Sequence, residues 1–112
     1  MLAQKFRLTK PGDFKLIFQQ GQKIFTPLFV IRYQPSRLAN SRFTVIVSNK
    51  ISKQAVARNK IKRRLREIIR LNISQFKQNY DLIITVLAPA VQATYVDLEK
   101  AYLSALKKYK LF

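Results

Sequence analysis

Residues 53–71 repeat their apolar side chains at helical spacing, and this segment decides which class of fold the chain can adopt. The stripe consists of Ala57, Ile61, Leu65, Ile68 and Ile69. These positions share one side of a helix with about 3.6 residues per turn. The stretches before and after it are rich in Val, Ile, Phe and Thr, which is typical of strands. A long amphipathic helix between strands predicts an α+β fold in which a sheet covers the apolar stripe.

Shorter elements are expected on both sides of this helix. A first helix is predicted over Pro11–Gln20, because Pro11, Gly12 and Asp13 are typical of a helix start and Gly21 of a stop. Strands are predicted at residues 23–25, 28–33, 42–48 and 80–87, and the first three are expected to be antiparallel neighbours because their connections are short. Thr94 is a candidate N-cap for a closing helix to about Tyr109, after which the terminal lysines are expected to fray. The predicted order is αβββαβα in a single domain over residues 1–112.

The charge balance limits the partners that the chain can have. It carries 22 Lys and Arg residues against 5 Asp and Glu, so its net charge is +17. Such a chain repels itself and gains free energy beside a polyanion, chiefly by releasing counterions from a nucleic acid. No stretch approaches the roughly 20 apolar residues that span a bilayer, and residues 1–10 lack a signal-peptide core. We therefore expect a cytoplasmic nucleic-acid-binding protein with no membrane partner and no small-molecule substrate.

Catalytic side chains are scarce. The chain has neither Cys nor His, which excludes thiolate metal sites and removes the commonest general base. Its five acids are scattered, and only Asp97 and Glu99 lie near each other. Their spacing places them on different faces of a helix, which disfavours a two-metal carboxylate site. We predict no catalytic residue and no metal site in this chain.

The predicted long helix carries most of the candidate binding residues. Residues 50–70 contain nine basic side chains and the single acid Glu67. On a helical projection, one arc beside the apolar stripe collects Arg58, Asn59, Lys62, Arg63, Arg66 and Arg70. A solvated helix surface normally mixes charges of both signs, so we favour contact with a polyanion over simple hydration. Like charges four residues apart cost roughly 0.2–0.5 kcal/mol each in an isolated helix, and a phosphate backbone would reverse that sign.

Phe14 and Phe18 form an aromatic pair one turn apart in the first predicted helix. One interpretation is core packing against a sheet. The other is a partly exposed platform for unpaired bases, worth roughly 1–3 kcal/mol per stacked base. The sequence leaves both interpretations open.

The run Ala57-Arg58-Asn59-Lys60-Ile61-Lys62-Arg63-Arg64-Leu65-Arg66-Glu67 resembles the signature helix of the bacterial ribonuclease P protein family. The resemblance covers nearly the whole chain, including Arg7-Leu8, Asp13-Phe14 with Phe18 and Gly21, Val47-Ser48 with Lys50, Tyr80-Asp81 and Pro89. It implies a two-layer α/β sandwich with a four-stranded, mostly antiparallel sheet and a left-handed βαβ crossover, similar to the second domain of ribosomal protein S5.

The resemblance also implies a function. A protein subunit of ribonuclease P binds the catalytic RNA subunit and the 5′ leader of precursor tRNA, and it assists removal of the leader. The cleavage chemistry would belong to the RNA and to Mg²⁺ held mainly by the RNA subunit and the substrate. Residues implied to meet the RNA subunit are Arg58, Asn59, Lys60, Lys62, Arg63, Arg66 and Arg70. Residues implied to meet the leader are Phe14, Phe18, Arg32 and Lys50.

Three positions depart from the family pattern. Lys60 replaces an Arg of the signature and loses planar bidentate recognition. Arg32 stands where relatives often have an aromatic residue, so its guanidinium would stack or contact phosphate instead. Leu87 occupies a position that is often Arg, which puts any RNA contact from that loop in question.

Other functions compete with this one. The main alternative is a ribosomal or other structured-RNA-binding protein with no role in cleavage. An autonomous nuclease is disfavoured because His and clustered acids are missing. A DNA-binding protein is disfavoured because the basic helix lacks the partner helix of a helix-turn-helix motif.

Overall fold

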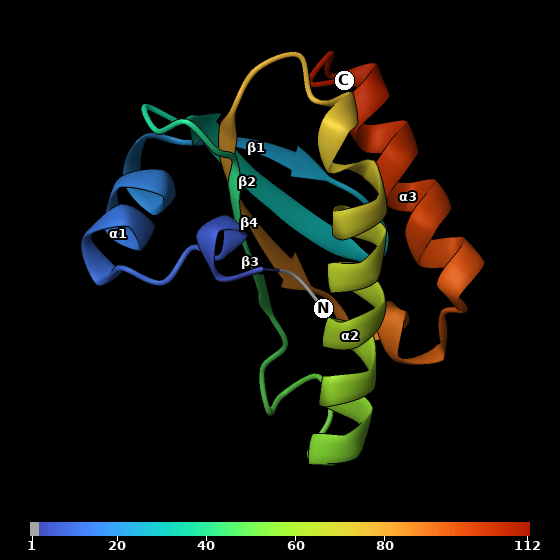
Figure 1. Ribbon diagram of the computed structural model, residues 1–112. Helices are drawn as coiled ribbons and strands as arrows, with labels where there is room; N and C mark the ends of the chain where they lie inside the picture. The colour runs from blue at the N-terminus through green and yellow to red at the C-terminus, as the bar shows by residue number, and fades with distance from the viewer. Residues whose placement is uncertain (1–2) are drawn as a thin grey trace.

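The computed structural model describes residues 3–112 as a mixed four-stranded sheet with helices on both faces. The helices are α1 (Pro11–Gln20), α2 (Ala55–Asn72) and α3 (Tyr95–Lys108), and the strands are β1 (Gln22–Phe25), β2 (Phe29–Pro35), β3 (Arg42–Ile46) and β4 (Tyr80–Val86). Short 3-10 turns, which the sequence pattern did not predict, occur at Gln4–Phe6, Ile73–Gln75 and Ala88–Gln92. Helices α2 and α3 lie on one side of the sheet and α1 on the opposite side (Figure 1). The predicted α+β order αβββαβα is confirmed.

The strands are ordered β1-β2-β4-β3 across the sheet. Antiparallel pairs join β1 to β2 and β2 to β4, whereas β3 and β4 are parallel and are connected through α2. The predicted βαβ crossover is therefore present, but the expectation that the first three strands are neighbours is wrong for β2 and β3. Strand β4 lies between them because its side chains are almost all buried, and such a strand needs a partner on each edge.

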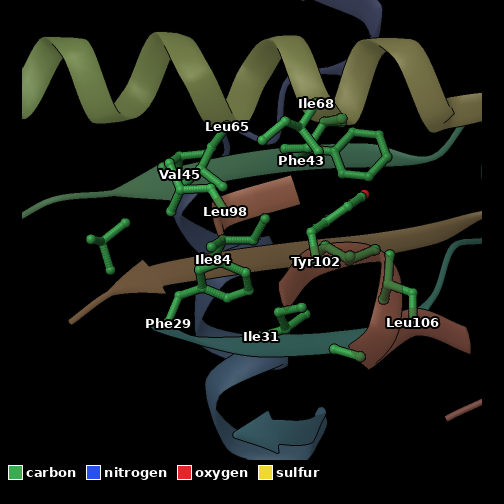
Figure 2. Close-up of a cluster of buried hydrophobic side chains, with 14 of the residues drawn as sticks. Phe29, Ile31, Phe43, Val45, Leu65, Ile68, Ile84, Leu98, Tyr102 and Leu106 are labelled. Carbon is green, nitrogen blue, oxygen red and sulfur yellow. The ribbon is translucent and has the colours of Figure 1, made fainter. Parts of the chain in front are cut away.

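The main core lies between the sheet and helices α2 and α3 (Figure 2). Alternate residues of the strands point to this side, so Phe43 of β3 and Ile84 of β4 line the same core as Leu65 and Ile68 of α2. All four side chains are at most 1% exposed. The helical stripe predicted from the sequence is therefore the face that α2 buries.

A second, smaller core lies under α1 on the other face of the sheet. It consists of Leu8, Ile17 and Ile83, with Phe14 and Ile46 packed against it. Ile17 is the buried residue of α1, and the helix ends at Gly21. A Cβ at Gly21 would come within 2.5 Å of the carbonyl oxygen of Ile17, so the close approach of the backbone requires glycine here.

The C-terminal tail is packed, which corrects the expectation that the terminal lysines fray. Leu111 is 2% exposed, and its carbonyl accepts a hydrogen bond from the amide of Lys77 at 3.0 Å. The ring of Phe112 lies edge-on to Phe76 at 4.8 Å between centroids. Two terminal apolar residues thus anchor the end of α3 to the turn after α2. The predicted N-cap Thr94 is confirmed, with Asp97 completing a reciprocal capping box.

Within residues 3–112, none of the helices has the length and apolar character needed to cross a membrane.

Candidate nucleic-acid interface

Most of the cations of helix α2 lie on one arc of the helix, beside its buried apolar stripe. Its apolar stripe fixes the rotation of the helix on the sheet, and the basic arc follows from that rotation. Lys62 and Arg66 are half-buried at the edge of the stripe, whereas Asn59, Lys60 and Arg63 are exposed. The helix turns Arg58, Asn59, Lys62, Arg63, Arg66 and Arg70 to one side, here called the α2 basic face, whereas the predicted Lys60 lies about 160° away from Lys62 around the helix.

Two arginines of α2 form contacts within the chain that distinguish them from Arg63. Arg70 hydrogen-bonds Glu67, with Nε donating to the carboxylate at 3.1 Å. This contact lowers the pKa of Glu67 and raises the pKa of Arg70, and it neutralises one predicted RNA-facing cation. Arg64 points to the other side of α2, where Nη1 donates to the carbonyl of Ala93 at 3.2 Å. Arg63 and Arg64, which are adjacent in the sequence, therefore lie on different sides of α2.

Two hollows flank the α2 basic face. A cavity of about 460 Å³ at the start of α2 is lined by Asn49, Lys50, Lys53 and Arg58. Arg58 is held there by a hydrogen bond from Nη1 to the carbonyl of Ser52 at 2.8 Å. Asn49 and Lys53 are not among the residues predicted to bind RNA, although the basic side chain of Lys53 immediately before the helix is a signal for it in the sequence.

The second hollow follows the outer edge of β3. It has a volume of about 190 Å³, and Arg7, Thr44 and Arg66 are among the residues that line it. The N-terminal segment forms this wall because Arg7 bridges to Phe43 and the amide of Leu8 donates to the carbonyl of Phe43 at 2.8 Å. Arg66 therefore connects the α2 basic face to the edge of the sheet that the N-terminal segment borders.

The sequence left two interpretations open for the phenylalanines of α1, and Phe14 fits core packing whereas Phe18 fits an exposed platform. Phe14 is partly buried against the small core, whereas Phe18 is 45% exposed. The guanidinium of Arg32, on the sheet face that α1 covers, lies 4.8 Å from the centroid of the Phe18 ring. Arg32 thus meets Phe18 as a cation–π partner.

Arg32 makes a side-chain hydrogen bond in this position. Its Nη1 donates to the hydroxyl of Thr85 on β4 at 3.3 Å, while its buried Nε has no hydrogen-bond partner among the described residues. The Phe18 ring, the guanidinium and the Thr85 hydroxyl together offer a stacking surface bordered by donors. This cluster, here called the α1 platform, has the chemical character that unpaired bases require.

Lys50 is predicted to meet the leader together with Phe14, Phe18 and Arg32, but it does not belong to the α1 platform. It lines the same hollow as Arg58, at the start of α2. The structure therefore associates Lys50 with the α2 basic face.

The carboxylates are engaged in structural contacts. Asp13 and Asp81 both bind Arg42, and Asp97 caps α3. Within the described part of the chain, no three His, Cys, Asp or Glu side chains come together in a way that could hold a metal ion. The arrangement can bind phosphates and stack bases, but its donor set does not fit a metal centre.

Comparison with known proteins identifies the family. Residues 2–110 match the family described as Ribonuclease P. The chain is 33% identical over 112 residues to the ribonuclease P protein component of Syntrophomonas wolfei, covering 100% of this chain and 93% of the relative. It is 46% identical over 77 residues to the component of Fusobacterium nucleatum, covering 69% of this chain and 68% of the relative.

Solved structures agree with these relatives. The ribonuclease P protein of Staphylococcus aureus superposes with a TM-score of 0.87 at 30% identity, covering 96% of this chain and 97% of that one. That of Thermotoga maritima gives a TM-score of 0.81 at 27% identity, covering 91% and 96%. The match over almost the full length, together with the basic signature helix on the sheet, places this chain in the ribonuclease P protein family as a protein subunit of that enzyme.

Proposed function

We propose that this subunit binds the ribonuclease P RNA through the α2 basic face and holds the single-stranded 5′ leader of precursor tRNA on the α1 platform. The observation that supports the proposal is that two chemically different surfaces lie on one sheet-based fold. One is a row of cations suited to a folded RNA backbone, and the other is an aromatic ring with a guanidinium suited to unpaired bases.

The α2 basic face would act mainly through charge. Arg63 and Lys62 can approach phosphates of a folded RNA, and each neutralised phosphate releases counterions. Lys50, Lys53 and Arg58 extend this surface around the start of α2 and would attract the RNA backbone between the two surfaces. The chain would thereby reduce repulsion between the RNA subunit and its substrate.

The α1 platform would extend the substrate contact beyond the cleavage site. A leader base stacked on Phe18 would also lie beside the donors of Arg32 and the hydroxyl of Thr85. Phe14 supports this surface from below because it packs against the small core. Binding energy from the leader would favour precursor over mature tRNA, which lacks these nucleotides.

We further propose that Mg²⁺ is held by the RNA subunit and the substrate. The donor set of this chain supports that assignment, since Asp13, Asp81 and Asp97 are used in ion pairs or a helix cap. When bound to RNA, Mg²⁺ supplies activation of water and stabilisation of the leaving oxygen. The chain's own part is to position the phosphates and the leader.

Reconstitution tests the proposal. The purified chain is mixed with ribonuclease P RNA at low Mg²⁺, and cleavage of precursor tRNA is followed with and without protein. We expect the protein to restore cleavage and to bind precursor tRNA more tightly than mature tRNA only when the RNA subunit is present. A structured-RNA-binding protein without a role in cleavage would instead leave the rate unchanged, and that result would refute the proposal.

A further inference from the structure

An ion cluster joins α1 to the sheet on the side of the helix opposite to Phe18. Arg42 of β3 lies beside Asp81 of β4 in the parallel register. Its Nε and Nη2 donate to the two oxygens of the Asp81 carboxylate at 3.0 and 2.8 Å. Its remaining terminal nitrogen, Nη1, donates to Asp13 on the first turn of α1 at 2.9 Å.

The cluster is rigid because of how its members are buried. The side chains of Asp81 and Arg42 are 4% and 13% exposed, whereas that of Asp13 is 28% exposed. The bidentate pair fixes the plane of the guanidinium on the sheet, so Nη1 has one direction in which to donate. Hydrogen bonding to Asp81, reinforced by Asp13, raises the pKa of Arg42 and keeps it charged.

Helix α1 has few other anchors. Its buried residue is Ile17, and its N-cap, Lys10, makes no side-chain capping hydrogen bond. With about 100° of rotation per residue, Asp13 and Phe18 fall on opposite sides of Ile17. Ile17 and the partly buried Phe14 form a narrow apolar contact with the sheet, and a helix that rests on such a contact can roll about it. A contact on one side of the helix then sets the height of the other side.

We propose that Asp13 and Arg42 are positioning residues for leader binding: their ion pair sets the roll of α1 and thereby the distance of Phe18 from Arg32. This inference rests on the proposed function of the α1 platform. In this role the cluster acts through the helix that carries the stacking ring.

The test uses Asp13→Ala in the reconstituted holoenzyme, because this change leaves the buried Arg42–Asp81 pair intact. KM and kcat are measured for precursor tRNA with a long leader and for one with the leader trimmed to a single nucleotide. We expect KM for the long leader to rise about fivefold to tenfold, the equivalent of one weakened stacking contact. KM for the trimmed substrate and kcat for both are expected to stay at wild-type values.

Two further variants separate positioning from other effects. Asp97→Ala raises the net charge by the same amount and removes a helix cap on α3, so it should leave the leader dependence of KM unchanged. Gly12→Ala combined with Asp13→Ala strengthens α1 without restoring the ion pair, and the Cβ at residue 12 meets no atom within 4 Å. This double variant should keep the raised KM.

The outcomes distinguish the two proposals. Equal KM values for both leaders in the wild-type holoenzyme would overturn the leader-binding function and this inference together. A normal leader preference in Asp13→Ala would overturn this inference alone. An equal rise of KM for both substrates, or recovery in the double variant, would also overturn it, because either result would trace the effect to assembly or to helix stability.

Discussion

Arg63 and Arg64 are adjacent in the sequence, carry the same charge and face different surroundings, so they provide a matched test of the α2 basic face. Arg63 is exposed on the proposed RNA side, whereas Arg64 donates to the carbonyl of Ala93 on the side of α3. Replacing either with Ala lowers the net charge by one. We expect Arg63→Ala to weaken binding to ribonuclease P RNA and to make the salt dependence shallower.

The magnitude follows from counterion release. Each phosphate contact contributes roughly −0.9 to the slope of log K against log salt concentration for duplex nucleic acid. Losing one such contact should therefore make the slope less negative by roughly 0.9. Between about 50 and about 200 mM salt, the affinity difference between wild type and Arg63→Ala should shrink by about threefold to fourfold.

The assay is equilibrium binding to the RNA subunit over a salt series, with both variants measured beside wild type. Arg64→Ala should keep the wild-type slope, since its guanidinium is directed at the backbone of Ala93. Equal changes in slope for the two variants would show that total charge determines binding. That result would refute the assignment of a specific RNA-facing side to α2.

Three further predictions concern stability, each measured by urea unfolding of the free chain. Leu65→Ala should lower the free energy of unfolding by about 2–5 kcal/mol, because this fully buried side chain fills the space between α2 and the sheet; a loss below about 1 kcal/mol would argue against that packing. Arg42→Met should cost about 3–5 kcal/mol by leaving the buried Asp81 without its partner, and adding Asp81→Asn should recover part of the loss. Tyr102→Phe should leave stability unchanged or raise it, because the buried hydroxyl has no hydrogen-bond partner within the described residues, and a loss above about 1 kcal/mol would show that it has one.

Helix periodicity was the most informative part of the sequence. The apolar stripe predicted a helix over residues 53–71, and α2 spans Ala55–Asn72 with the predicted face buried. Strand pairing was predicted less well, because alternation identifies which face of a strand is buried but not which strand lies next to it. The insertion of β4 between β2 and β3 depends on the long connection through α2, which local patterns do not encode.

The candidate site shows the same division between local and long-range information. The α2 basic face could be predicted because all its members lie on one helix. The contact of Arg32 with Phe18 could not, since it joins a strand to a helix across the fold. The cluster of Asp13, Arg42 and Asp81 could not be predicted either, because its pairs are separated by 29 and 39 residues and its members lie in three different predicted elements.

The use of the carboxylates connects the fold to the function. Asp13 and Asp81 hold Arg42, Glu67 binds Arg70 and Asp97 caps α3, so four of the five acids are bound within the chain. Three of them stabilise the attachment of α1 or the start of α3, and only Glu67 lies on α2. The cations of α2 are therefore left largely without internal counterions, and the helix holds them close together. Binding of a polyanion would relieve this repulsion, so the same distribution of acids that builds the fold favours the proposed contact of α2 with RNA.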